Sequence, residues 1–364
     1  MGFSCGFIGL PNVGKSTLFN ALTNAGALAA NFPFCTIEPN TGIVPVPDPR
    51  LAELAKMHKS KKIVPAAMKF IDIAGLVGGA SKGQGLGNKF LGHIRNVDAI
   101  AHVVRLFEDE NVAHVSGTLD PVGDMETIIT ELALADLDIL ERRITKTEKN
   151  TRTGDKEALK ELPMLKEFYK NLSEGTNIDT SDPVTASFAK DLGLISTMPA
   201  FICANVDEKS IPRIDDIINT HPLSKFAAKH NMEIIPVCAK LEEEITQLSP
   251  EEAEEFMKEM SLKESGLSRV IKTGYKILNY ITFLTTGEDE TRAWTITKGT
   301  LAPQAAGKIH TDMERGFIRM EVISYEDIIQ CGSETEAKNH GKMRIEGKDY
   351  VIKDGDVVHV RFSV

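Results

Sequence analysis

The sequence predicts an α/β protein in which a doubly wound sheet domain is interrupted by a helical hairpin and followed by a small α+β domain. Short apolar segments alternate with helical segments up to residue 104 and again after residue 199. Between them, residues 125–172 show only helical periodicity. Because strands that alternate with helices form mostly parallel sheets, we expect the two flanking parts to belong to one domain.

The elements of the sheet domain follow from apolar runs of strand length. The first strand is expected at residues 7–8 and the next helix at 17–24, where the apolar spacing becomes helical. Further apolar runs bounded by turns or helices lie at residues 68–73, 98–104, 199–204 and 234–238.

The middle of the chain is expected to form two helices joined by a polar tip. Apolar side chains recur at helical spacing from Met125 to Ile144, and a second stripe runs from Leu159 to Leu172. The stretch 145–156 between them is polar. Pro163 is expected either to kink the second helix or to mark its start.

The last 85 residues or so are expected to form a module of the size of one small domain. Short strands are predicted at residues 291–297, 316–320, 350–352 and 357–362. The predicted boundaries are residues 1–124 and 198–279 for the sheet domain, 125–197 for the hairpin insertion and 280–364 for the C-terminal domain.

Composition narrows the class of protein. No run of about 18 apolar residues is present and no signal peptide precedes the first strand, so we expect a soluble, cytoplasmic protein without a membrane partner. The five cysteines are scattered, which favours reduced thiols over disulfides or zinc. The net charge of −10 means that any nucleic-acid contact must come from local basic patches, and DNA is not expected as a partner.

Residues 9–16, Gly-Leu-Pro-Asn-Val-Gly-Lys-Ser, match the phosphate-binding loop G-x-x-x-x-G-K-S in full. Its backbone N–H groups and the following helix N-terminus bind phosphates. Lys15 is expected to reach the β- and γ-phosphates and Ser16 to ligate Mg²⁺. A chance match in a glycine-containing turn is the alternative, but the position between an apolar strand and an amphipathic helix favours the phosphate site.

Two further motifs suit a nucleoside triphosphate with Mg²⁺. Asp72 begins D-x-x-G at the end of a predicted strand, where its carboxylate can hold Mg²⁺ through water and the N–H of Gly75 can approach the γ-phosphate. A plain turn is the alternative. Thr36 is the predicted switch hydroxyl for Mg²⁺, with Thr41 as the fallback and a structural loop as the alternative.

Residues 205–208, Asn-Val-Asp-Glu, stand where guanine-specific proteins have N-K-x-D. The Asp of that motif accepts hydrogen bonds from guanine N1–H and the 2-amino group. Here Glu208 replaces it, and its extra methylene would crowd the guanine edge. Asp207 is one place early and its side chain is expected to point elsewhere. We therefore expect ATP to bind better than GTP.

These motifs together resemble the YchF family of Obg-like ATPases, within the translation-factor class of P-loop proteins. The resemblance covers nearly the whole chain. It implies a C-terminal β-grasp (TGS) domain, slow ATP hydrolysis, Mg²⁺ and association with ribosomes. It also implies phosphate contacts from the loop residues, Mg²⁺ ligation by Ser16 and Thr36, and adenine contacts from Asn205 and Val206. The loop residues concerned are Asn12, Val13, Gly14, Lys15, Ser16 and Thr17.

The catalytic group is less evident, because Leu76 stands where many related GTPases have a Gln that orients water. His114 in a polar loop is the candidate replacement, with an exposed loop histidine as the alternative, and His93 is a weaker candidate. The predicted function is an ATP-hydrolysing regulator of translation or stress response. The alternatives are a GTP-dependent switch and a nucleotide-gated scaffold that uses hydrolysis as a timer.

Two basic clusters are candidates for rRNA contact. One gathers near a predicted helix end, at Lys56, His58, Lys59, Lys61 and Lys62. The other gathers at the hairpin tip, at Arg142, Arg143, Lys146, Lys149 and Arg152. A solvated surface with helix C-terminal charge compensation is the alternative for both. The resemblance to a ribosome-associated family favours rRNA contact for the hairpin tip.

Overall fold

The computed structural model describes residues 3–29, 40–73, 88–108 and 119–363. The chain divides into two compact units, each with its own core. Unit 1 comprises residues 3–43 and 69–270, and unit 2 comprises residues 44–68 and 271–364. Residues 44–68 therefore pack with the C-terminal unit, although in sequence they lie between strands of the first. None of the described helices is long and apolar enough to span a lipid bilayer.

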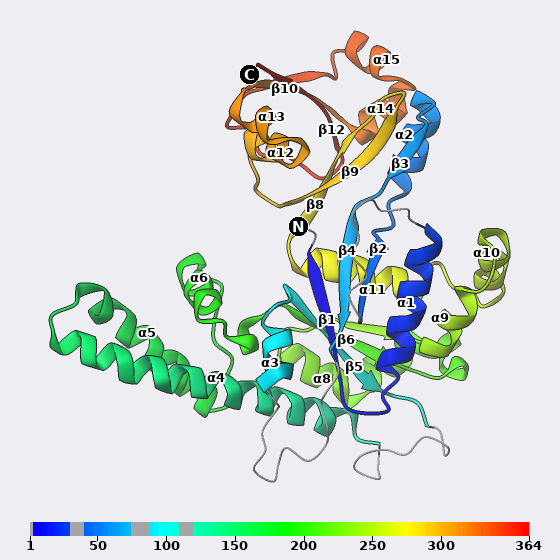
Figure 1. Cartoon of the computed structure of the whole chain (residues 1–364). Coiled ribbons are helices and arrows are strands. Elements are labelled where there is room, and N and C mark those ends of the chain that lie inside the picture. The colour runs from blue at the N-terminus through cyan, green and yellow to red at the C-terminus, as the bar shows by residue number, and fades with distance from the viewer. Residues whose placement is uncertain (1–2, 30–39, 74–87, 109–118, 364) are drawn as a thin grey trace. The chain divides into compact units, whose positions relative to one another are not determined.

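The described strands of unit 1 form one sheet, shown in Figure 1. They are β1 (Ser4–Ile8), β2 (Thr41–Pro45), β4 (Ala67–Asp72), β5 (Ala99–Arg105), β6 (Ala200–Asn205) and β7 (Ile234–Val237). Their order is β2-β4-β1-β5-β6-β7, and the neighbours from β4 to β7 are parallel. The predicted doubly wound α/β class is confirmed.

Helices cover both faces of this sheet. The helices outside the helical insertion are α1 (Lys15–Ala29), α3 (Asn88–Ile94), α7 (Ile214–Thr220), α8 (Pro222–Lys229), α9 (Ala239–Ile245) and α10 (Pro250–Glu259), with 3-10 helices η2 (Ile195–Thr197) and η3 (Glu208–Arg213). The last helix, α11 (Gly266–Ile277), begins in unit 1 and ends in unit 2. On one face Ile8 and Ile100 pack with Ile94 of α3. On the other, Phe7 and Phe70 stack with ring centroids 5.3 Å apart. Because both faces are covered, the strand ends are where ligands can bind.

The helical insertion consists of α4 (Pro121–Arg152), α5 (Lys156–Ser173) and α6 (Pro183–Leu192). Leu140, Leu165 and Phe168 form its apolar seam. The carboxylate of Asp155 caps α5 by accepting from two backbone N–H groups. The predicted hairpin is confirmed, but its turn is short because α4 continues to Arg152. Pro163 lies inside α5 and does not mark its start.

Unit 2 is a β-grasp domain, as the resemblance implied. Its sheet has the order β11-β10-β12-β8-β9-β3, with β12 parallel to β8 at the centre. The strands are β3 (Lys62–Val64), β8 (Tyr280–Thr285), β9 (Glu290–Thr297), β10 (Phe317–Ser324), β11 (Arg344–Glu346) and β12 (Asp356–Phe362). The helices are α2 (Pro49–His58), α12 (Ala302–Ile309), α13 (Thr311–Arg315), α14 (Tyr325–Cys331) and α15 (Glu334–Asn339). Ala302, Ala305 and Ala306 pack α12 on Phe283 and Met320.

The predicted strand at residues 350–352 is wrong. Val351 forms only an isolated antiparallel bridge with Leu301. The apolar side chain of Ile352 is buried in the core of unit 2, which explains the apolar run without a strand. Residues 44–68 contribute the edge strand β3, which pairs in parallel with β9. They also contribute α2, where Arg50 donates to Asp354 at 2.8 Å.

Candidate nucleotide site

The loop between β1 and α1 has a backbone conformation that requires glycine at two positions. Gly14 has φ 88°, in the left-handed region. A Cβ at Gly9 would lie 2.6 Å from the carbonyl oxygen of Val103. The N–H of Leu18 donates to Gly14 O at 3.0 Å, the first hydrogen bond of α1. The preceding amides of the first helical turn have no intrahelical acceptor, and they make this end of α1 an anion-binding site.

Two charged groups and one hydroxyl converge beside this loop. Phe7 of β1 and Asp72 of β4 are register partners, so the ends of the two strands meet at one edge of the sheet. Lys15 Nζ forms an ion pair with Asp72 Oδ1, and each side chain is 12% exposed. Ser16 Oγ lies 3.4 Å from Asp72 Oδ2. The structure thus brings together Lys15, Ser16 and Asp72, three residues assigned from separate motifs.

The oxygens of Ser16 and Asp72 are the kind of ligand that Mg²⁺ prefers. Within the described ranges no group of three His, Cys, Asp or Glu side chains could hold a metal ion. A cation at Asp72 would therefore need hydroxyl and phosphate oxygens as well, as in other P-loop sites, where the protein supplies few ligands. The donor set present fits Mg²⁺ bound together with a nucleotide.

Several predicted site residues lie outside the described part of the chain: Thr36, Gly75, Leu76 and His114. Thr41, the fallback for Thr36, begins β2. Next to it, the N–H of Asp72 donates to the O of Asn40 at 2.9 Å. His93 lies exposed near the end of α3.

Asn205 connects the phosphate loop to the loop after β7. Its Nδ2 donates to Val13 O at 2.9 Å, and its Oδ1 accepts from the N–H of Ala239 at 3.0 Å. The side chain is buried, and a Cβ on Gly14 would collide with Nδ2. Sequence reasoning had associated Asn205 with adenine and missed this bridge. The sequence feature that could have indicated this bridge is the position of Asn205. It is the last residue of a buried parallel strand, level with the phosphate loop.

The three residues after Asn205 point in different directions. Val206 is 3% exposed and packs in an apolar cluster with Ile211, Cys238 and Leu241. Asp207 caps η3 by accepting from the N–H of Ser210 at 2.8 Å, which confirms that its side chain points elsewhere. The Glu208 side chain is exposed.

Glu208 nevertheless lies near the loop that follows β7. Burial raises the pKa of the Cys238 thiol, and the nearby carboxylates of Glu208 and Glu242 raise it further. Glu242 is a second residue that sequence reasoning missed. It is buried in α9, and its Oε1 accepts from the N–H of Gly266 at 2.6 Å, which fastens this loop region to α11. No clear signal was present in the sequence, because Glu242 is the first of three consecutive glutamates and nothing in that run marks which of them is buried.

Comparisons with known proteins agree with this geometry. A family model described as a 50S ribosome-binding GTPase matches residues 4–136. The model of the YchF GTPase C-terminal domain, described as a protein of unknown function, matches residues 280–363.

Full-length relatives are also found. This chain is 52% identical to the ribosome-binding ATPase YchF of Haemophilus influenzae and 50% identical to that of Bacillus subtilis, with 100% of both chains covered in each case. The solved structure of the Schizosaccharomyces pombe YchF GTPase has a TM-score of 0.86 at 36% identity and covers 99% of this chain and 98% of its own. With a complete phosphate loop in unit 1 and a β-grasp unit 2, this chain belongs to the YchF family of P-loop NTPases.

Proposed function

We propose that this protein hydrolyses ATP and associates with ribosomes, because the bacterial relatives are named ribosome-binding ATPases. We propose further that hydrolysis is slow, because Leu76 stands where related GTPases have a water-orienting Gln. The observation that supports nucleotide hydrolysis best is the convergence of Lys15, Ser16 and Asp72 on the first turn of α1. Each of these groups has a place in phosphoryl transfer, which depends on positioning and charge neutralisation more than on covalent chemistry.

In this proposal the Lys15 ammonium exchanges the Asp72 carboxylate for phosphate oxygens. Backbone N–H groups of the loop residues Asn12, Val13, Gly14, Ser16 and Thr17, with that of Gly75, complete the phosphate site. Ser16, Asp72 and Thr36 would hold Mg²⁺, which neutralises phosphate charge when bound. Asn205 holds the phosphate loop against the start of α9, because its one side chain pairs with Val13 in the loop and with Ala239 in the helix.

The preference for ATP over GTP tests which residues bind the base of the nucleotide. Wild type should bind ATP at least about tenfold better than GTP, a difference of about 1.4 kcal/mol, because no Asp stands at position 208 to pair with guanine. Glu208→Asp should narrow this preference by raising GTP affinity. Val206→Lys is a poor partner for this test, because it would place an ammonium in the apolar cluster around Val206.

Calorimetry with ATP, ADP, GTP and GDP in Mg²⁺ buffer measures these affinities. Glu259→Asp, a change on α10 of unit 1, is the matched control and should leave all four unchanged. Equal or tighter binding of GTP by wild type would instead favour the alternative of a GTP-dependent switch, which the GTPase family model and the name of the fission yeast relative suggest.

The catalytic group is proposed to be His114, since Leu76 cannot orient water. His114→Ala should lower the single-turnover rate of hydrolysis while leaving the Kd for ATP nearly unchanged, the result of an interaction made mainly in the transition state. His340→Ala is the control, because His340 is exposed at the end of α15 in unit 2 and belongs to no candidate site. Single-turnover measurements with and without ribosomes check this. Equal rates for wild type and His114→Ala in both conditions would exclude His114.

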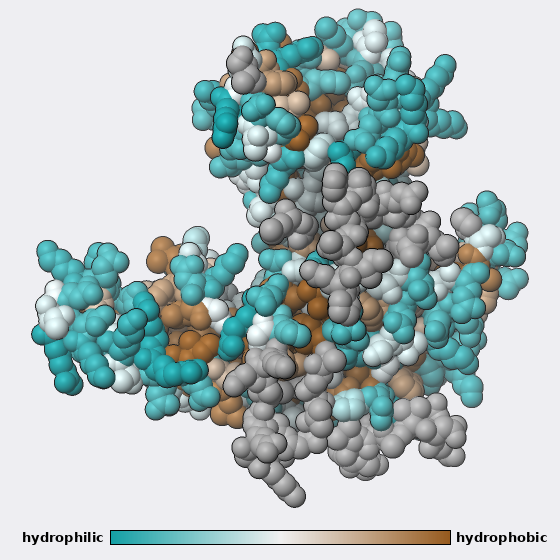
Figure 2. Space-filling model, in the orientation of Figure 1, coloured by the Kyte–Doolittle hydropathy of each residue, from teal (hydrophilic) through white to brown (hydrophobic). Residues whose placement is uncertain are grey.

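We propose the hairpin tip as the ribosome contact. A ribosome partner also supports the proposal of a cytoplasmic protein. Figure 2 shows the far end of the hairpin covered by hydrophilic side chains. Arg143 is paired with Glu161 at 2.8 Å, but Lys146 and Lys149 are exposed and have no carboxylate within 4 Å in the described part of the chain. In the other basic cluster, Lys61 pairs with Asp289 at 2.8 Å and Lys62 lies 3.8 Å from Glu290. Acidic partners therefore offset that cluster.

Charge reversal distinguishes the two clusters. Lys146→Glu with Lys149→Glu should reduce co-sedimentation with ribosomes at least about tenfold, and more salt should weaken binding by wild type, because phosphate contacts release counterions. Lys61→Glu with Lys62→Glu is the matched control, expected to have the smaller effect. Should the hairpin variant bind as wild type does, the contact lies elsewhere. Ribosome binding that changes with the bound nucleotide but does not require hydrolysis would favour the alternative of a nucleotide-gated scaffold.

A further inference from the structure

Unit 1 contains a cavity of about 910 Å³ that is separate from the nucleotide site. It lies at the amino ends of β5, β6 and β7, between α4, the segment 172–181 and the end of α8. The phosphate loop follows the carboxyl end of β1, which is parallel to these strands, so the two sites lie at opposite edges of the sheet. The volume is within the range of small-molecule sites, roughly 300–1,000 Å³.

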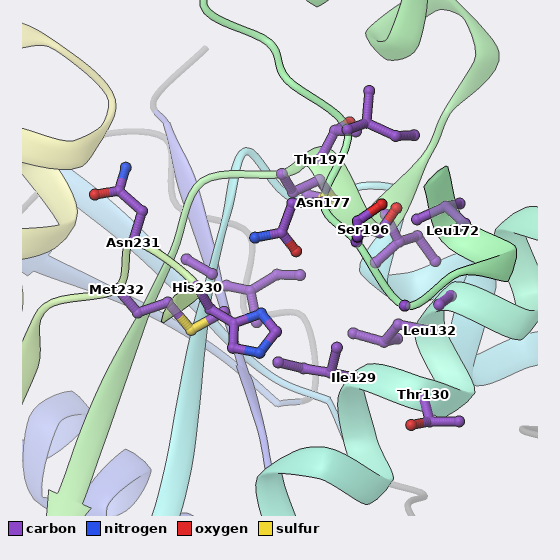
Figure 3. Close-up of a pocket in the computed structure, with 18 of the residues that line it drawn as sticks. Ile129, Thr130, Leu132, Leu172, Asn177, Ser196, Thr197, His230, Asn231 and Met232 are labelled. Carbon is purple, nitrogen blue, oxygen red and sulfur yellow. The ribbon is translucent and has the colours of Figure 1, made fainter. Parts of the chain in front are cut away.

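The cavity lies over β5, between α4 and the end of α8. Toward the carboxyl end, Val104 packs against Met125 and Phe226. Toward the amino end, the same face of β5 presents Ile100 and His102, and both line the cavity. Ile129 and Leu132 of α4 complete an apolar floor, as Figure 3 shows.

Polar groups surround this floor, and most of them are uncharged. Asn177, Ser196, Thr197 and Asn231 line the edge (Figure 3). The charged residues among those that line the cavity are Glu126, Asp179 and Lys229, so carboxylates outnumber ammonium groups. This balance disfavours a phosphate-bearing ligand such as ATP and favours a neutral one.

His102 is a buried polar group without a partner. Its side chain is 1% exposed, and its Nδ1 has no hydrogen-bond partner among the described residues. Burial lowers the pKa of His102 to about 4, and the neighbouring His230 lowers it further, so the imidazole is neutral at physiological pH. A buried ring nitrogen without a partner costs about 1–3 kcal/mol, and a bound group would recover part of this once the ring turns that nitrogen toward the cavity.

The planar ring of His230 forms one side of the cavity. Its ring lies 4.5 Å from that of Phe226, centroid to centroid, at 34°. Figure 3 shows the Asn177 amide and the His230 imidazole facing each other across the cavity. Burial also lowers the pKa of His230. A planar ring can therefore lie against an aromatic wall and an apolar floor while its polar edge meets neutral donors and acceptors.

We propose that this cavity is a second binding site, for a small neutral heteroaromatic molecule whose ring N–H pairs with the His102 imidazole. Indole is the probe, because it has a single ring N–H on an apolar body, and 1-methylindole is the matched compound without that donor. Ligand-observed NMR titration of the full chain measures both affinities, with and without saturating Mg²⁺–ATP.

Indole should bind wild type saturably, at least fivefold more tightly than 1-methylindole, and Mg²⁺–ATP should not displace it. Asn177→Trp fills the cavity from an exposed loop position and should weaken indole binding at least tenfold. Glu174→Trp is the control: Glu174 is exposed in the same turn, outside the cavity lining, and this variant should bind as wild type does. His102→Leu should abolish the preference for indole over 1-methylindole, which a merely structural role would not change.

Three results would overturn the proposal. The first is an absence of saturable indole binding by wild type, which would mean that only water occupies the cavity. The second is displacement of indole by Mg²⁺–ATP, which would place the probe in the nucleotide site. The third is an equal loss of binding in Asn177→Trp and Glu174→Trp. None of these results depends on the rate of ATP hydrolysis, so the two proposals are tested separately.

Discussion

Lys15→Ala should reduce ATP hydrolysis at least about 100-fold, the scale of losing one preorganised charged or hydrogen-bonding group from a transition state. Lys15 is the cation that the structure places against Asp72 at the start of α1. Without Lys15, the negative charge that develops on the phosphate oxygens in the transition state loses its main side-chain partner. The measurement is single-turnover hydrolysis of ATP, together with the Kd for ATP.

The fold should survive this change. Lys15 is partly exposed and its pair with Asp72 lies at the edge of the sheet, so thermal unfolding should shift by only a few degrees. Lys170→Ala removes an exposed lysine from the last turn of α5 and is the matched control, with unchanged activity expected. Full turnover by a folded Lys15→Ala protein would refute the site assignment.

Asn205→Ala should impair both stability and nucleotide binding. It removes the donor to Val13 O and the acceptor from the Ala239 N–H, and each buried group left unpaired costs about 1–3 kcal/mol. The phosphate loop and the start of α9 then lose the side chain that connects them. We expect a lower free energy of unfolding and at least a tenfold higher Kd for ATP, measured by denaturant titration and calorimetry.

Asn20→Ala on the exposed face of α1 is the control for this prediction, and it should change neither quantity appreciably. The nucleotide itself provides a second check. Saturating ATP should stabilise wild type more than Asn205→Ala, because the shift in unfolding free energy grows with the ratio of ligand concentration to Kd. An Asn205→Ala protein with unchanged stability and affinity would contradict the bridging role.

The elements that the sequence predicted are those whose physical cause is local. The phosphate loop needs glycines and a helix N-terminus within eight residues, and Gly14 indeed has a positive φ. The hairpin follows from apolar spacing along two continuous helices, which depends on nothing outside them. The strands β5 and β6 were found for the same reason, because every residue of β5 is buried and five of its seven residues are apolar.

Only the tertiary structure determined which distant segments pack against each other. The strand β3 has three residues, two of them exposed, and becomes a strand only because β9 lies beside it, more than 200 residues away in sequence. Asn205 bridges the phosphate loop and the start of α9 only because the fold brings them together. The cavity beside His102 likewise exists only because α4 and the end of α8 meet over β5. Periodicity determines which face of an element is buried. It leaves open which other element covers that face, because many apolar faces can pack against one another and only long-range geometry selects among them.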